Sequence, residues 1–355
     1  MAPLTHPRLV DVVSAPPEHV VPQAVAAAFA RQTFAGRLPQ LERLMPIFEH
    51  AGIETRRTCQ PLDWYQRDHS LAETSAAYIE AATTLCARAT RALLERQGLA
   101  PDAIDRVIYV NTTGLATPSI DARLINLLGL RANVRRTPIW GLGCAGGVAG
   151  LSHAYQHVVG HPRERVLLCC AELCSLTLLR DDATTSNVVA TALFADGAGA
   201  ALISGAETGD RGYELIDSRS TLYPDSLHVM GWNVVSHGLQ VVFDRRIPQI
   251  VARHACAELD AFLGAHELTR ADVTEYLFHP GGPKVLAAYA AAYGVALERF
   301  AWSRAVLREF GNMSSVTVLY VLERYLRSQP PGRGGLAVLS ALGPGFSSES
   351  LLMRL

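Results

Sequence analysis

The sequence predicts an α/β protein built from two similar halves. Apolar stretches of strand length alternate with amphipathic stretches of helix length, and residues 99–110 (LAPDAIDRVIYV) resemble residues 268–279 (LTRADVTEYLFH). Cys144 lies 34 residues after the end of the first segment, and Asn312 lies 33 residues after the end of the second. A repeat of about 168 residues is far longer than a solenoid repeat and indicates an internal duplication. We therefore expect two domains, 1–205 and 206–355.

The first half is expected to begin with a Pro- and Ala-containing segment, residues 1–60, with helical stretches near 22–31 and 40–50. Residues 70–97 carry Ala, Leu and Ile at helical spacing and are followed by Gly98, which is typical of a helix end. The other elements expected in this half are strands at 105–110, 165–170 and 198–203 and helices at 119–128 and 145–159.

The second half is expected to repeat this order. A buried strand ends at His279, an Ala-rich packed helix covers 285–296, a further helix covers 313–326 and a strand covers 335–341. Ligand sites of such sheets form outside the carboxyl ends of the strands. The equivalent turns of the two halves should therefore meet at one site.

A glycine-rich turn, GLGCAGG at 141–147, delivers Cys144 to the start of a helix. Unpaired N–H groups and the positive end of the helix dipole favour a thiolate there, so a nucleophilic cysteine is the first hypothesis. The alternative is that Cys144 is a small buried hydrophobic residue in a packing turn, since free cysteines are often buried.

His279 and Asn312 offer the chemistry that a nucleophilic cysteine needs. A cysteine beside an imidazole can ionise as a thiolate–imidazolium pair, and a histidine and an amide NH₂ can together donate to an oxyanion or enolate. Taken singly, His279 is typical of a strand-end packing residue and Asn312 of a helix N-cap. Their duplicated positions relative to Cys144 favour an active site.

Composition excludes several other classes. The net charge of −1 and the absence of a basic run argue against a nucleic-acid-binding protein. No apolar run reaches the roughly 18 residues of a membrane span, and the N-terminus lacks a signal-peptide pattern. We expect a cytoplasmic protein with its seven cysteines reduced. Lys284 is the only lysine, and this arginine bias indicates a GC-rich, bacterial genome.

Several motifs, in order along the chain, resemble those of type III polyketide synthases of the chalcone synthase superfamily. They are GCAGG (143–147), LFADG (193–197), HPGG (279–282), GNMSS (311–315) and GPG (343–345). The segments VMGW (229–232) and GLQVVFDRRIP (238–248) resemble bacterial members that make long-chain alkylpyrones. The resemblance covers essentially the whole chain and implies a thiolase-like αβαβα layered fold and a homodimer.

The resemblance also implies roles for the three candidate residues. Cys144 would take the starter acyl group from coenzyme A as a thioester, and His279 would help to hold Cys144 as a thiolate. His279 and Asn312 would then donate to the thioester carbonyl of malonyl-CoA and stabilise the enolate left by decarboxylation. Loss of CO₂ drives each condensation, so we expect neither a metal nor a redox cofactor. The substrates would be acyl-CoA and malonyl-CoA, with an acyl carrier protein as an alternative starter donor.

Further cavity residues follow from the same resemblance. Phe194 matches the family's gatekeeping phenylalanine between the coenzyme A tunnel and the cavity. Thr113, Thr177 and Ser314 fall where the family lines its initiation and elongation cavity.

The sequence departs from the plant enzymes of the family at two cavity positions. The second gatekeeping phenylalanine is Val241 here, which leaves space for an aliphatic chain, and Trp232 replaces a glycine. These changes favour a fatty acyl-CoA starter over an aromatic one. The basic residues that grip coenzyme A in the plant enzymes have no clear match, and Arg43, Arg56 and Arg57 are the candidates.

Three alternatives stay open. A β-ketoacyl carrier-protein synthase III-like enzyme shares the fold and the Cys/His/Asn set but performs one condensation; the GNMSS and GPG motifs favour the iterative enzyme. A type III synthase could also use an aromatic or malonyl starter. A non-catalytic partner subunit would have no reason to keep Cys144. The spacing of residues does not determine how many malonyl units are added. It also does not determine whether the chain closes to a pyrone or to a resorcinol.

Other histidines and cysteines are expected to be structural. His153, His157 and His161 repeat at helical spacing, but no acidic ligand is evident, so a solvated helix face is expected rather than a metal site. Three further cysteines lack the paired spacing of zinc sites and are expected in the core near the cavity: Cys169, Cys170 and Cys174.

Overall fold

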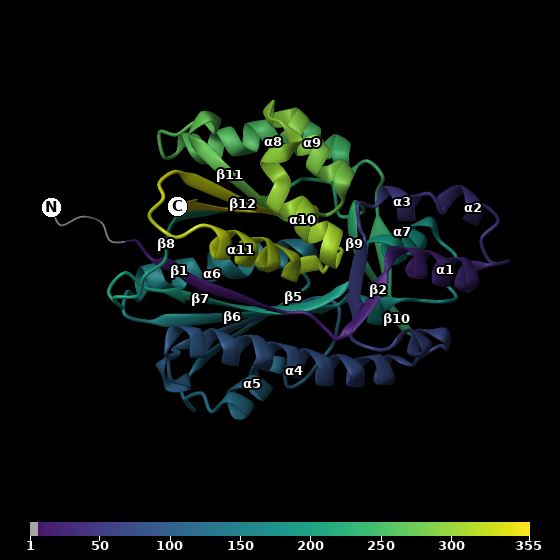
Figure 1. Cartoon of the computed structure of the whole chain (residues 1–355), viewed down its shortest axis with the longest axis horizontal. Coiled ribbons are helices and arrows are strands. Elements are labelled where there is room, and N and C mark those ends of the chain that lie inside the picture. The colour runs from purple at the N-terminus through teal and green to yellow at the C-terminus, as the bar shows by residue number, and fades with distance from the viewer. Residues whose placement is uncertain (1–5) are drawn as a thin grey trace.

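The computed structural model describes residues 6–355 and arranges them in alternating layers of helix, sheet, helix, sheet and helix (Figure 1). The helices are α1 (Gln23–Phe34), α2 (Leu41–Leu44), α3 (Ile47–His50), α4 (Leu71–Gln97), α5 (Ile120–Leu128), α6 (Gly146–Gly160), α7 (Thr185–Leu193), α8 (Ile247–Gly264), α9 (Pro283–Tyr293), α10 (Ala301–Phe310) and α11 (Thr317–Ser328). The strands are β1 (Arg8–Ala15), β2 (His19–Pro22), β3 (Thr55–Thr58), β4 (Arg106–Asn111), β5 (Arg135–Trp140), β6 (Arg165–Leu173), β7 (Asp196–Ser204), β8 (Tyr213–Leu222), β9 (Met230–Val235), β10 (Gly238–Phe243), β11 (Val273–Phe278), β12 (Leu336–Gly343) and β13 (Ser347–Arg354).

The strand order shows the duplication directly. The nine-stranded sheet runs β11, β12, β13, β8, β1, β7, β6, β4, β5. Apart from the edge strand β5, which has no counterpart, this order is symmetric about the β8–β1 pair, because β7, β6 and β4 on one side match β13, β12 and β11 on the other. The strands β4 and β6 are parallel, as are β11 and β12, while β7 and β13 are antiparallel to their neighbours. The predicted two-half α/β architecture is confirmed.

Three apolar cores lie between the layers. The core under α4 joins this helix to β1, β6 and β7 on the outer face of the first half. The core under α8 and α9 covers the outer face of the second half. Between the half-sheets, α6 packs against β6 and also β12 and β13, while α11 packs against β1 and β7 and also β11. Each central helix therefore contacts strands of both halves (Figure 1).

Local sequence signals explain the best-predicted helix. At the start of α4, Ser70 accepts a hydrogen bond from the backbone N–H of Glu73, and the Glu73 carboxylate accepts one from the Ser70 N–H, which forms a capping box. At its end Gly98 adopts the left-handed conformation, with φ of 62°. The prediction of one long helix over 70–97 is confirmed.

The N-terminal segment differs most from its prediction. The strand β1 lies at the centre of the sheet, although only helices were expected within residues 1–60. The helix expected near 40–50 is two short helices, α2 and α3, separated at Pro46, because proline lacks the N–H that a continuous helix requires. Within residues 6–355 no helix combines the length and apolar character needed to cross a membrane.

The three spaced histidines lie on α6, at His153 and His157, and directly after it, at His161. His153 and His161 are exposed, but the His157 side chain is only 10% exposed and its Nε2 lies 2.7 Å from Glu164 Oε2. The expected solvated face is therefore confirmed for His153 and His161 but wrong for His157, which has an acidic partner. The partner comes from the turn between α6 and β6.

Candidate active site

Cys144 is held in a tight turn between β5 and α6. The residues Gly143–Ala145 form a single 3-10 turn, and Cys144 is buried within it. Gly143 has φ of 48°, and a Cβ there would lie 2.6 Å from Pro344 Cδ. Its backbone N–H donates to Thr112 Oγ1 at 2.9 Å. Glycine is thus required because the turn is left-handed and presses against the Pro344 loop.

Asn312 is fixed by the first half of the chain. Its N–H donates to the Leu193 carbonyl and its carbonyl accepts from the Ala195 N–H, both at 2.9 Å, which makes a single parallel bridge beside Phe194. Its Oδ1 accepts from the Ser314 N–H at 2.9 Å. Because the side-chain oxygen is occupied in this way, the side-chain NH₂ is the group that can donate to a ligand. Its contact with the Gly281 carbonyl oxygen is long, at 3.3 Å.

His279 follows directly after β11. Its backbone N–H donates to the Ser340 carbonyl at 2.8 Å, which continues the pairing with β12. Both ring nitrogens are buried and have no hydrogen-bond partner among the described residues. An imidazole with both nitrogens unoccupied is free to exchange a proton or to donate to a ligand.

The three side chains line one cavity of about 490 Å³. They come from the turn before α6, the end of β11 and the turn before α11, so the structure brings together all three residues predicted from the sequence. Other residues lining this cavity are mainly apolar and include Leu44, Ile47, Val189, Leu193, Met230, Phe243, Ile247, Val285, Tyr289 and Leu342.

Burial disfavours a lone charge on either reacting group. It raises the pKa of the Cys144 thiol to about 12, against smaller lowering contributions from hydrogen bonding by Ser314 and Asn312. It lowers the pKa of His279 to about 3. Each group taken alone is therefore neutral near pH 7, and a thiolate there requires the proton to pass to a neighbouring base.

Phe194 lines a second, smaller cavity of about 80 Å³. Its ring centroid lies 5.5 Å from that of Phe243, which lines the larger cavity, and 5.9 Å from that of Trp232, which lines the smaller. Trp232 and Val241 are paired directly across the β9–β10 hairpin, and both line the smaller cavity with Thr177.

Thr113 and Ser314 line neither of these two cavities, but Thr113 lines a further small cavity of about 20 Å³, which Thr177 also lines. The Thr113 hydroxyl donates to Glu172 at 2.7 Å and accepts from the Leu173 N–H at 2.9 Å. Ser314 has φ of 48°, which is uncommon for a residue with a side chain, and its hydroxyl is a hydrogen-bonding neighbour of the Cys144 thiol. Both are buried.

Glu172, inside β6, was not identified from the sequence. Its Oε2 accepts from the N–H groups of Thr112 and Thr113 at 3.0 Å each, and its Oε1 accepts from Ser315 Oγ at 2.7 Å. Burial raises its pKa, against the lowering effect of these hydrogen bonds. The side chain therefore joins both halves of the chain behind the Cys144 turn. The sequence feature that could have identified Glu172 is an acidic residue within an otherwise apolar strand.

Basic side chains line the outer part of the larger cavity. Arg43, Arg245 and Lys284 line it and are exposed, and their side chains make no hydrogen bond or ion pair within residues 6–355. Arg56 is instead buried and donates to the carbonyls of Thr191, Ala192 and Phe194.

Comparison with known proteins identifies the family. The family model for the N-terminal domain of chalcone and stilbene synthases matches residues 6–208, and that for the C-terminal domain matches residues 214–355. A 1,3,6,8-tetrahydroxynaphthalene synthase of Streptomyces peucetius is 40% identical over 314 residues, covering 88% of this chain and 83% of that protein. A phloroglucinol synthase of Pseudomonas fluorescens is 28% identical, covering 94% of this chain and 95% of that protein.

The solved structures agree with the sequence matches. The 1,3,6,8-tetrahydroxynaphthalene synthase of Streptomyces coelicolor, a bacterial type III polyketide synthase, superposes with a TM-score of 0.91 at 29% identity, covering 98% of this chain and 99% of that chain. The chain therefore belongs to the chalcone and stilbene synthase family and is a type III polyketide synthase, an acyltransferase with a thiolase-type fold.

Proposed function

We propose that this polyketide synthase adds malonyl-CoA units iteratively to an acyl group held as a thioester on Cys144. The observation that carries the proposal is the single, mainly apolar cavity lined by Cys144, His279 and Asn312. Substrates of this chemistry combine an apolar acyl chain with a reacting thioester, and a mainly apolar cavity with three converging polar groups suits both.

The loading step uses Cys144 and His279. The Cys144 proton passes to the imidazole, the thiolate attacks the starter thioester carbonyl, and the coenzyme A thiolate leaves and takes up a proton. The unpartnered ring nitrogens of His279 support this role, because no protein group competes for the proton.

The condensation step uses His279 and Asn312 as donors. An imidazole N–H and the Asn312 NH₂ donate to the thioester oxygen of malonyl-CoA, the bond to the carboxylate breaks, and CO₂ leaves behind an enolate. The enolate carbon attacks the acyl-Cys144 thioester, so that a carbon–carbon bond forms while the carbon–sulfur bond breaks and the thiolate returns. The hydrogen bond that Oδ1 of Asn312 accepts supports this role, since it leaves the side-chain NH₂ to donate to the substrate.

We favour a long-chain fatty acyl starter and alkylpyrone or alkylresorcinol products. Val241 and the small cavity beyond Phe194 support this, because a valine leaves room that a phenylalanine would fill. A malonyl or aromatic starter is the second candidate, and it is supported by the names of the relatives, which refer to tetrahydroxynaphthalene and phloroglucinol. A single condensation, as in a β-ketoacyl carrier-protein synthase III, is a third.

We further propose that Arg43, Arg245 and Lys284 bind the phosphates of coenzyme A. They are exposed cations on the same cavity as buried Cys144, which suits a ligand with a charged end and a reacting end. Lys284→Ala should raise the KM for malonyl-CoA by roughly 2- to 5-fold, with a smaller change in kcat. Arg211→Ala, an exposed cation outside this cavity, is the control. Equal KM values for both variants would contradict the proposal.

The product assay tests the starter. Purified protein is given malonyl-CoA with acyl-CoA starters from acetyl to stearoyl, an aromatic starter and no starter, and the products are identified by mass spectrometry. Tri- or tetraketides that peak with long starters support the first candidate. Products from malonyl-CoA alone or from the aromatic starter support the second, and a single β-ketoacyl product supports the third.

Two variants test the roles of the site residues. Cys144→Ala should abolish covalent loading of a radiolabelled starter, whereas Asn312→Ala should load normally but lose malonyl-CoA decarboxylation. Cys256→Ala, which lies outside the cavity, should resemble the wild type in both assays. Loading of Cys144→Ala at the wild-type level would overturn the assignment. The homodimer stays a prediction, to be checked by sedimentation equilibrium.

A further inference from the structure

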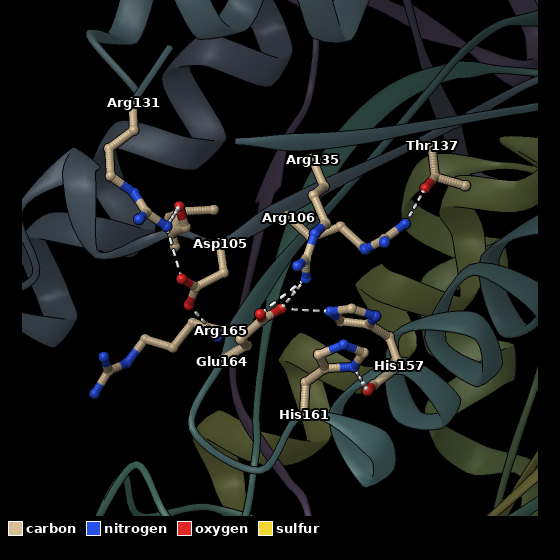
Figure 2. A network of polar contacts seen from close by, with 10 residues as sticks. Asp105, Arg106, Arg131, Arg135, Thr137, His157, His161, Glu164 and Arg165 are labelled. Atoms are coloured by element: carbon tan, nitrogen blue, oxygen red, sulfur yellow. Dashed lines mark hydrogen bonds and ion pairs between the residues drawn. The ribbon is translucent and has the colours of Figure 1, made fainter. Parts of the chain in front are cut away.

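A second cluster of potential ligands lies at the opposite end of α6 from Cys144. His157 is on the last turn of the helix, His161 directly follows its last residue, and Glu164 is in the turn that leads to β6 (Figure 2). One ligand atom from each of the three lies within 4.8 Å of the others. The 15 residues of α6 put this cluster about 20 Å from the Cys144 turn, so it is separate from the polyketide site.

His161 is oriented as metal-binding histidines are. Its Nδ1 lies 3.0 Å from the His157 carbonyl oxygen. A carbonyl oxygen only accepts, so Nδ1 carries the proton and Nε2 holds a free lone pair. A backbone carbonyl that fixes the tautomer and ring orientation in this way is a recurring second partner of metal-ligating histidines. This hydrogen bond is independent of the proximity of the three side chains.

His157 and Glu164 complete the donor set. His157 Nε2 lies 2.7 Å from Glu164 Oε2, and its ring stacks on that of His161 with centroids 4.3 Å apart. Glu164 also accepts from Arg135 Nη1, at 2.8 Å to Oε1 and 2.9 Å to Oε2. A carboxylate has about four acceptor sites, so Oε1 can keep the arginine while Oε2 binds an ion.

The neighbouring cations leave room for an ion. Arg135 is half exposed, so its guanidinium can move toward solvent. Arg106 donates to Thr137 Oγ1 at 2.6 Å, and Figure 2 shows it directed away from the two imidazole rings. The ion would therefore enter from the exposed His161 side.

We propose that His157, His161 and Glu164 bind a divalent transition-metal ion of the zinc type. Two imidazole nitrogens and one carboxylate oxygen are a common zinc donor set, whereas Mg²⁺ and Ca²⁺ prefer oxygen ligands alone. The ion takes the place of the proton on His157 Nε2, and that proton moves through solvent to Nδ1 of the same ring. The ring stays neutral, so binding releases no net proton. Water completes the coordination at the exposed side.

The ion would fasten the end of α6 to the start of β6. Because it binds the folded chain, it should raise the unfolding temperature as its concentration rises. This consequence does not depend on the polyketide chemistry, so failure of the metal test leaves the proposed function untouched.

Zinc binding to the metal-free protein tests the proposal. Wild type, His161→Gln and His153→Gln are titrated with Zn²⁺ by calorimetry, each in a Cys144→Ser background that removes the active-site thiol. His153→Gln is the matched control, because His153 is an exposed histidine of α6 outside the cluster. Removing an outer partner of a metal site lowers metal affinity by roughly 10- to 100-fold. His161 would be a direct ligand, so His161→Gln should lower the Zn²⁺ affinity by at least this factor.

A thermal melt gives the second readout. Zn²⁺ should raise the melting temperature of the wild type and His153→Gln more than that of His161→Gln, while all three melt alike without metal. Equal affinity and equal thermal shifts in the three proteins would overturn the proposal and show adventitious binding only. Equal binding of Mg²⁺ and Zn²⁺ by the wild type would also overturn it.

Discussion

At the scale of single residues, the proposed chemistry depends on two groups that burial keeps neutral when each is considered alone. Burial raises the pKa of Cys144 to about 12 and lowers that of His279 to about 3. Proton transfer from the thiol to the imidazole creates both charges together, and their attraction at low dielectric offsets part of the desolvation cost. In the proposed loading step, a reactive thiolate near pH 7 therefore requires His279.

The pH dependence of Cys144 alkylation tests this coupling. In His279→Gln the thiol keeps its raised pKa, so thiolate is lost as the pH falls below about 12 and alkylation at pH 7 should drop at least about tenfold. The rate should keep rising through the alkaline range, whereas the wild type should level off at lower pH. Peptide mass spectrometry follows Cys144 alone, and His153→Gln is the control. Superimposable profiles for all three proteins would show that His279 does not set the thiolate population.

In the proposed function, Val241 limits the length of the starter chain, because it lines the smaller cavity. Val241→Phe places a ring in a space of about 80 Å³ that Thr177 and Trp232 also line, so the preferred starter should become shorter. The assay compares kcat/KM across the acyl-CoA series. Val242→Phe, on the neighbouring residue outside both cavities, is the control. An unchanged preference in Val241→Phe would show that this side chain does not limit the acyl chain.

At the scale of elements, α6 begins in close contact with the second half of the chain. A Cβ at Gly147 would lie 2.1 Å from the Ser315 carbonyl oxygen and 2.6 Å from Val318 Cγ1. Gly160, at the other end of α6, has nothing within 4 Å of its Cβ position. Gly147 is required for the close approach of the turns that carry Cys144 and Asn312, whereas Gly160 is not.

Paired alanine substitutions test this difference within one helix. Gly147→Ala should destabilise the protein by about 1–3 kcal/mol or more through overpacking and should also reduce starter loading. Gly160→Ala should be neutral or stabilising, by up to about 1 kcal/mol, because alanine favours the helix. Urea unfolding measures the free energy, and loading of Cys144 measures the site. Similar losses of unfolding free energy in both variants would contradict this argument. They would mean that helix propensity, and not the close approach to Ser315, explains the glycine at position 147.

At the scale of the whole molecule, the two halves share one central core. Apolar side chains of α6 and α11 belong to the same buried cluster, and each helix packs on strands of the other half. Asn312 in the second half is held by Leu193 and Ala195 of the first. The site is therefore a property of the joined halves.

Separate expression of the halves tests this dependence. Residues 1–205 or 206–355 alone would expose the face of the sheet that the shared core covers, so neither fragment should show a cooperative thermal transition by circular dichroism. Co-expression should restore folding and Cys144 loading. Cooperative melting of one isolated fragment would contradict the shared-core argument. The domain boundary at 205/206 itself stays a prediction.

The sequence by itself determined the two-half α/β fold and the three residues Cys144, His279 and Asn312, because duplicated strand-turn-helix patterns and reactive residue types are local properties of the chain. It did not predict that β1 is central, because pairing with β7 and β8 is a long-range contact. The position of Glu172 behind the Cys144 turn was likewise decided only in the tertiary structure.

The same distinction applies to the other sites. Only the folded chain shows that Phe194 packs near Phe243 and Trp232, that Thr113 and Ser314 line neither of the two cavities, and that Glu164 meets His157 and His161. These features depend on side chains from separate elements, whose distances are set by packing and cannot be inferred from spacing along the chain.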